Sequence, residues 1–176
     1  MDIKPATEAD LPALIRLHDS AFGTVFEGRL VADLMAADLA AISLVASVEG
    51  DVILGHILFS PLLVEVGCDT ALALALAPLA VAPAHQRQGV GSALVAAGLD
   101  EARRQGWDCA VVLGHPEYYR HFGFAPEPLQ GFQAPFEGPA FMALELRQSA
   151  LSGRKGRIIY PEPFGIPAHA DPVPAG

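Results

Sequence analysis

A polar loop from Gln86 to Gly91, Gln-Arg-Gln-Gly-Val-Gly, has residue types and a spacing that could bind an anion. Apolar residues that alternate from Leu79 precede it, and apolar residues at helical spacing follow it from Leu94. Glycines let the backbone approach a ligand closely, and the first turn of a helix offers unpaired N–H groups and the positive end of its dipole. Arg87 adds a guanidinium that suits phosphate. The loop therefore predicts a phosphate-binding site where a strand meets a helix.

Three common motifs fit this loop less well. An ordinary glycine-bearing turn gives no packing reason for the cluster of Gln and Arg side chains. A dinucleotide-binding turn needs a third glycine or an alanine, but Leu94 stands at that position. The sequence has no Gly-x-x-x-x-Gly-Lys-Ser/Thr motif, so a P-loop that hydrolyses nucleotides is unsupported.

The loop resembles the acyl-CoA pyrophosphate loop of the GNAT acetyltransferase superfamily, whose pattern is Gln/Arg-x-x-Gly-x-Gly/Ala. The resemblance covers roughly residues 3–146 and is sharpest over residues 79–124. Two further segments, Gly-His-Ile-Leu-Phe-Ser-Pro at 55–61 and Tyr-Tyr-Arg-His-Phe-Gly-Phe at 118–124, are most similar to the small YhbS-like predicted acetyltransferases. The resemblance implies a transferase that uses acetyl-CoA as its co-substrate.

The resemblance also implies which residues hold the coenzyme. The backbone of a strand would pair with the pantetheine arm at an edge that Pro78 helps to free, and an amide of the same strand would stabilise the oxyanion. The strand residues are Leu79, Ala80 and Val81, of which Ala80 or Val81 would donate to the oxyanion. The loop and helix residues that would bind the pyrophosphate are Gln86, Arg87, Gln88, Gly89, Val90, Gly91, Ser92 and Ala93.

Tyr119 is the candidate acid that protonates the leaving thiolate. It lies four residues before Gly123, as in the aromatic-Tyr-x-x-x-Gly-Phe pattern of the family, where the phenol faces the thioester sulfur. A phenol with a pKa near ~10 donates to a thiolate only at close range. The alternatives are a core aromatic that anchors the turn at residues 122–124, or the same acid role for Tyr118.

The base that deprotonates the acceptor amine has several candidates. An ammonium with a pKa near ~10 must lose its proton before it attacks. His56 has a suitable pKa range and is assigned here, although a hydrogen-bonded core histidine fits its mid-strand position equally well. The other candidates are His115, Glu117 and Glu65, which is predicted to lie past Pro61 on a separate strand. Many family members use a water chain without a single base.

Composition excludes several classes of function. The chain has 176 residues, 52% of them hydrophobic, which fits one domain with a substantial core. Its net charge of −9 argues against nucleic-acid binding and mildly favours an amine-bearing partner. The longest uncharged apolar stretch, Ala71 to Ala84, contains two prolines and is shorter than the ~20 residues of a membrane span. No membrane partner is therefore expected.

The cysteines and histidines do not indicate a metal. Cys68 and Cys109 are the only cysteines, and none of the His or Cys residues has ligand spacing. Asp2 and Lys4 stand where a signal peptide would become apolar, so a cytoplasmic protein with free thiols is expected. Cys109, in an apolar run, is predicted to be buried and inert.

The periodicity predicts an α/β fold with a mixed sheet. The resemblance implies a GNAT-like transferase domain over residues 1–150, whose mostly antiparallel sheet has a splayed central strand pair and flanking helices. A Pro/Gly-rich extension follows over residues 151–176, and from Gly153 onward it is predicted to form an extended tail. The expected strands begin at Ile3 and cover residues 42–48, 52–59, 71–81, 109–113 and 141–146, with a hairpin turn at 49–51. The first expected helix starts at residues 7–10, where Asp10 is a capping-box-like acid three residues after Thr7, and ends before Gly23. The other expected helices cover residues 27–37 and 91–105, and a short helix or turn covers 116–121.

These observations predict an N-acetyltransferase in which an amine of a small molecule or protein attacks acetyl-CoA directly in a ternary complex. The alternative is a non-catalytic module that binds or senses acyl-CoA, which needs the loop but no acid. By the resemblance, the acceptor lies near residues 22–34, His56 and residues 131–139, and a homodimer is a common assembly. The sequence does not identify the acceptor.

Overall fold

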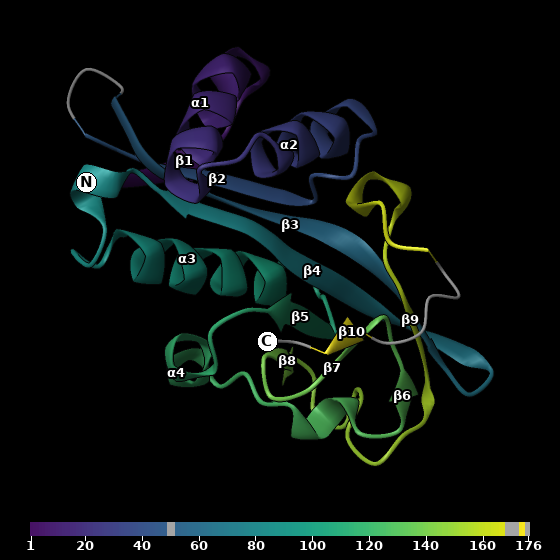
Figure 1. The fold of residues 1–176 in the computed structure, drawn as a ribbon. Helices are drawn as coiled ribbons and strands as arrows, with labels where there is room; N and C mark the ends of the chain where they lie inside the picture. Colours follow the sequence, from purple (N-terminus) through teal and green to yellow (C-terminus); the bar gives the residue numbers. More distant parts are fainter. Residues whose placement is uncertain (49–51, 168–172, 175–176) are drawn as a thin grey trace. The chain divides into compact units, whose positions relative to one another are not determined.

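The computed structural model describes residues 1–48, 52–167 and 173–174 (Figure 1). Its contacts divide the chain into two units, Met1–Ser60 with Ala77–Glu101, and Pro61–Leu76 with Ala102–Gly176. Two long strands, β3 (Val52–Val66) and β4 (Asp69–Val81), and the helix α3 (Val90–Arg104) run through both units. The mixed α/β architecture with a mostly antiparallel sheet is as predicted.

The first unit contains an antiparallel run of three strands. β1 (Asp2–Pro5) pairs with β2 (Ile42–Val48), and β2 pairs with the first half of β3, so that Val45 lies opposite His56. Figure 1 shows α1 and α2 on one face of these strands and α3 on the other. Because successive side chains of a strand point to opposite faces, neighbouring residues of β3 meet different helices.

The two N-terminal helices pack against each other and against the sheet. The helix α1 (Leu11–Phe22) follows a 3₁₀ turn in which the backbone N–H of Thr7 donates to the Asp10 carboxylate at 2.7 Å, as the predicted capping box requires. Leu14, Leu17 and His18 are buried, and Gly23 ends the helix at a φ of +73°. The helix α2 (Phe26–Ala36) buries residues of one face, Leu30, Val31 and Leu34.

The second unit holds the other strands. The first half of β4 pairs in parallel with β5 (Cys109–Leu113), which pairs antiparallel with β8 (Phe141–Glu145). The short helix α4 (Pro116–Tyr119) follows β5. The remaining strands are short: β6 (Phe132–Gln133), β7 (Phe136–Glu137), β9 (Gly156–Ile159) and β10 (Val173–Pro174), with β7 parallel to β10.

One strand prediction was too short, and one segment predicted as a tail contains a strand. The strand expected to end at Phe59 continues through Pro61 to Val66, because its alternation persists, with Val64 and Val66 buried and Leu63 exposed. Its last residues pair with β9, so that Leu63 lies opposite Ile159. The segment after Gly153 was predicted as an extended tail, but it supplies β9 and buries Tyr160 and Phe164. The predicted turn at residues 49–51 lies outside the described residues.

Helix α3 can lie close to the sheet because it presents a glycine to a large ring. Gly98 packs against the fully buried ring of Phe59, and a Cβ at this position would collide with the ring. Leu94 and Val95 are buried on the same side of the helix. Among the described residues, no helix is both long enough and apolar enough to cross a membrane.

Candidate functional site

The predicted phosphate-binding loop lies in the first unit, between a 3₁₀ turn (Pro83–His85) and α3. Arg87 and Gly89 adopt left-handed backbone conformations, with φ values of +59° and +86°. The N–H of Ala93 donates to the carbonyl of Gly89 at 3.0 Å and closes the first turn of α3. The preceding amides, of residues 90–92, lie in the first turn, where a helix provides no internal acceptor. The loop and these amides together have the geometry of an anion cradle.

The two glutamines of the loop brace it. Gln86 Nε2 donates to the carbonyl of Val81 at 3.2 Å, and Gln88 Nε2 donates to the carbonyl of Ala84 at 3.0 Å. Their amide groups thus hold the loop to the segment before it. Arg87 is exposed and has no hydrogen-bond or ion-pair partner within the described part of the chain. The guanidinium is therefore the one side-chain cation of the loop that is available to an anion.

Gly55 of β3 lets the end of β4 and the start of α3 approach closely, a role that the sequence did not indicate. A Cβ at this position would lie 3.0 Å from the carbonyl oxygen of Ala80 and 3.0 Å from side-chain carbons of Val90 and Leu94. The backbone N–H of Ala82 donates to the carbonyl of Leu54 at 2.8 Å. Because position 55 has no side chain, the end of β4 and the start of α3 both pack directly on β3.

His56 points to the opposite face of β3 and is fully buried under α1. Its Nδ1 lies 2.8 Å from His18 Nε2, and its Nε2 lies 2.9 Å from Ser43 Oγ. His18 stacks on Phe22 with an interplanar angle of 4°, and its Nδ1 has no partner among the described residues. This is the hydrogen-bonded core histidine that the sequence left open as the alternative to a base.

Burial keeps both histidines neutral. Desolvation, helped by the neighbouring His18, lowers the pKa of His56 to about 3, although the nearby Asp10 carboxylate opposes the shift. Desolvation lowers the pKa of His18 to about 4. Since both ring nitrogens of His56 already have partners inside the protein, this histidine has no free nitrogen with which to meet a substrate.

Tyr119 lies in the second unit, at the end of α4, and is buried. Its ring meets those of Tyr118 and Phe124 edge to face, at centroid distances of 5.0 and 5.7 Å, and a side chain at Gly114 would collide with it. Burial, with a smaller effect of Tyr118, raises the pKa of Tyr119 above its ordinary value. The phenol therefore stays protonated at neutral pH, as an acid must. The ring also anchors the turn before Phe124, as the alternative prediction proposed.

The remaining candidate bases differ in their surroundings. Glu65 lies on β3, where its Oε2 is 3.1 Å from the Arg157 Nε of β9, so it is committed to an ion pair. His115 and Glu117 are exposed at the start of α4. The prediction that placed Glu65 on a separate strand was wrong, because β3 is continuous to Val66.

The second unit also holds the buried thiol. Cys109 is fully buried, and burial, reinforced by the charges of Asp108 and Glu145, raises the pKa of its thiol to about 12. The thiol is therefore unreactive at neutral pH. The described residues contain no group of three His, Cys, Asp or Glu side chains that could hold a metal ion.

Comparison with known sequences identifies several relatives of this chain. A family model described as an acetyltransferase (GNAT) domain matches residues 2–126. The uncharacterized N-acetyltransferase YhbS of Escherichia coli is 31% identical over 166 residues, which make up 93% of this chain and 98% of YhbS. The uncharacterized N-acetyltransferase YjhQ of E. coli is 38% identical over 135 residues, 75% of this chain and 74% of YjhQ.

Solved structures agree with these relationships. The crystal structure of E. coli YhbS in complex with CoA has a TM-score of 0.84 and 30% identity, and the alignment covers 93% of this chain and 91% of that chain. A GNAT family acetyltransferase from Brucella melitensis in complex with acetyl-CoA has a TM-score of 0.76 and 30% identity, with 93% and 97% covered. The family prediction is therefore confirmed: the chain belongs to the GNAT family of acyl-CoA-dependent N-acetyltransferases.

Proposed function

We propose that this protein transfers an acetyl group from acetyl-CoA to an amine by direct attack in a ternary complex. The observation that carries the proposal is the loop before α3, where left-handed Arg87 and Gly89 precede open helix amides and the Arg87 side chain has no protein partner among the described residues. The YhbS structure with CoA and the B. melitensis structure with acetyl-CoA support the choice of coenzyme.

The donor would be held mainly by backbone. Amides of residues 88–93 would bind the diphosphate, with Arg87 as the charged side chain, while Gln86 and Gln88 keep the loop in shape. The pantetheine arm would pair with the backbone of Leu79–Val81, and an amide of Ala80 or Val81 would stabilise the oxyanion. Gly55 supports this arrangement because it lets the carbonyl of Ala80 lie against β3.

In the proposed chemistry, the acceptor nitrogen attacks the thioester carbonyl, and the C–S bond of the tetrahedral intermediate then breaks. Tyr119 gives its phenolic proton to the departing thiolate. Its hydroxyl has no hydrogen bond to another described residue, so its proton is not already committed within the protein. The amine loses its proton to water, and the Tyr119 phenolate regains a proton from water. His56, whose ring nitrogens contact His18 and Ser43, takes no direct part in this step.

The acceptor would approach the turn between α1 and α2. Phe22, Val25 and Phe26 are large apolar side chains that the first unit leaves exposed there. The net charge of −9 favours the approach of an ammonium, and the exposed rings would contact an apolar part of the same molecule. We therefore expect amines that carry an apolar group to be better acceptors than small polar amines.

Calorimetry with coenzyme A tests the donor site. Arg87→Glu should weaken binding by roughly tenfold or more, since a charge-assisted hydrogen bond contributes ~1.5–3 kcal/mol. The matched control is Arg16→Glu, a charge reversal at an exposed arginine of α1 in the same unit, which should leave affinity within twofold. Equal losses in both variants, or no binding by the parent protein, would refute the donor site.

A panel of amines tests the transfer itself. The parent protein, saturated with acetyl-CoA, should release free thiol and add the mass of one acetyl group to at least one amine. Coenzyme binding without release for any amine would favour a non-catalytic acyl-CoA sensor instead.

A further inference from the structure

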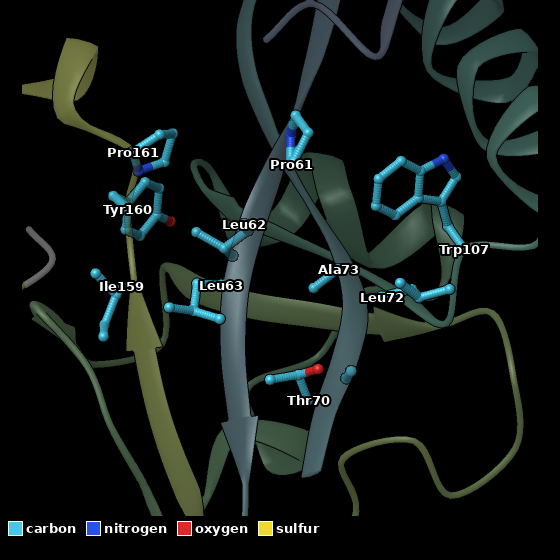
Figure 2. A pocket seen from close by; sticks show the side chains of 11 residues that line it. Pro61, Leu62, Leu63, Thr70, Leu72, Ala73, Trp107, Ile159, Tyr160 and Pro161 are labelled. Carbon is cyan, nitrogen blue, oxygen red and sulfur yellow. The ribbon is translucent and has the colours of Figure 1, made fainter.

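A groove in the second unit has no part in the proposed transfer. It has a volume of about 510 Å³, within the ~300–1,000 Å³ range of small-molecule sites. Figure 2 shows its floor on β3 and β4, with Tyr160 on one side and Trp107 on the other. Leu63 and Leu72, on these two strands, are 46% and 58% exposed although they are large and apolar. Contiguous exposed apolar side chains of this kind mark binding surfaces.

The hydroxyl of Tyr160 is the second observation that points to a ligand. The residue is 8% exposed, and its ring is held by edge-to-face contacts with Phe136 and Phe164 at centroid distances of 5.7 and 5.1 Å. Its hydroxyl makes no hydrogen bond to any residue that the structure describes. Figure 2 shows the oxygen pointing toward Leu62, at the floor of the groove. A buried tyrosine normally has a partner for its O–H, so this donor is available to a bound molecule.

The opposite wall presents an apolar surface. The indole N–H of Trp107 donates to Gln105 Oε1 at 3.0 Å, so the polar edge of the ring is already satisfied. None of the residues that line the groove is charged. Moving an ammonium or a phosphate into such surroundings would leave its charge unpaired, which is costly. The groove therefore suits an uncharged molecule.

We propose that this groove binds an uncharged, apolar small molecule with one hydrogen-bond acceptor, such as a carbonyl. The acceptor oxygen would take the hydrogen bond from Tyr160, and the apolar part would pack between Trp107 and the leucines of β3 and β4. The site does not depend on acetyl transfer, because its residues do not include those assigned to the donor or to Tyr119.

The test uses Trp107, the one tryptophan of the chain, as an internal reporter. The uncharged dye N-phenyl-1-naphthylamine is titrated into the full-length protein, and energy transfer from Trp107 to the dye is recorded. Two competitors of nearly equal shape then displace the dye: 4-phenyl-2-butanone, which has a carbonyl, and n-butylbenzene, which has none. We expect saturable dye binding, with the ketone competing more strongly than the hydrocarbon.

Variants separate the two parts of the site. Tyr160→Phe should weaken the ketone roughly 3- to 10-fold and leave butylbenzene within twofold, because only the hydrogen bond is lost. Leu72→Glu and Leu63→Glu should each abolish dye binding. Val52→Glu is the matched control, since Val52 is a 55% exposed strand residue outside the groove.

Three outcomes would overturn the proposal. The first is the absence of saturable dye binding to the parent protein, and the second is an equal loss of both competitors in Tyr160→Phe. The third is sedimentation as a dimer that Leu72→Glu dissociates, which would show that a second copy of the chain covers the groove. Thermal unfolding of each variant verifies its fold, and the two glutamate variants provide independent tests if one of them does not fold.

Discussion

The buried histidine pair makes the stability of the fold depend on pH above the range where carboxylates titrate. His18 and His56 have pKa values of about 4 and 3 in the folded protein, against 6.5 for an ordinary histidine. In the unfolded chain both rings take up a proton below pH 6.5, whereas in the folded chain they remain neutral. The stability that the neutral pair provides is therefore complete above pH 6.5, and it is lost as the pH falls toward 4.

The size of the effect follows from the number of protons. Two protons that only the unfolded state binds give a slope of about 2.7 kcal/mol per pH unit, and the loss between neutral pH and pH 5 is about 4 kcal/mol. This is a large share of the ~5–15 kcal/mol by which domains are stable. The carboxylates with lowered pKa values, Asp10, Asp108 and Glu145, contribute mainly below pH 4. The window from pH 6.5 to 5 therefore isolates the histidines.

Urea unfolding at pH 7.5, 6.5, 5.5 and 5.0 measures this slope. The double variant His18→Leu/His56→Leu removes both rings, and its free energy of unfolding should lose most of its dependence on pH in this window. The comparison uses slopes, so a change in the overall stability of the variant does not affect it. A parent protein whose stability is flat from pH 7.5 to 5, or a variant that keeps the parental slope, would refute the reasoning.

Three further predictions concern single positions. Tyr119→Phe should lower kcat by roughly 10²- to 10⁴-fold while coenzyme affinity, measured by calorimetry, stays within twofold; a parallel loss of both would point to a packing role. Gly98→Ala should destabilise the fold by about 1–3 kcal/mol in urea unfolding, despite a helix-propensity gain of ~1 kcal/mol, and Phe59→Leu should relieve the loss by making room for the new Cβ. Asp108→Ala should cost about 1–2 kcal/mol in the same measurement, because the carboxylate accepts hydrogen bonds from Arg147 Nε and the backbone N–H of Leu72.

The sequence predicted the glycine-bearing loop and α3 because their signals are local. A glycine pair after polar residues, followed by apolar residues at helical spacing, lies within about twenty residues, and the structure places α3 within one residue of the expected bounds. The strand at residues 71–81 was also identified correctly against its helix-forming composition, since its period of two outweighed the propensity of Ala and Leu. Patterns that depend only on neighbours in sequence therefore predicted the observed elements correctly.

The contacts that give His56 its surroundings could not be predicted in the same way. His18 is 38 residues away on a helix, and no pattern in the sequence states that the two rings meet. The pairing of β9 with the end of β3 likewise joins residues about ninety positions apart, which is why the last segment was predicted as a tail. Such contacts are set by how the elements pack, and the alternation of a single strand does not reveal its partner.

Two adjacent residues of β3, Gly55 and His56, explain why this strand can pair in only one register. Gly55 leaves space for the carbonyl of Ala80 and the first turns of α3, while His56 fills the opposite face and pairs with His18 and Ser43. A slip of one residue would direct the imidazole into the contact with α3 and leave His18 without its partner under α1. Both errors would be costly, because the first is a steric clash and the second leaves a buried polar ring unsatisfied. The histidine pair therefore helps to fix the strand that supports the loop, which gives it a structural role in donor binding without contact with the coenzyme.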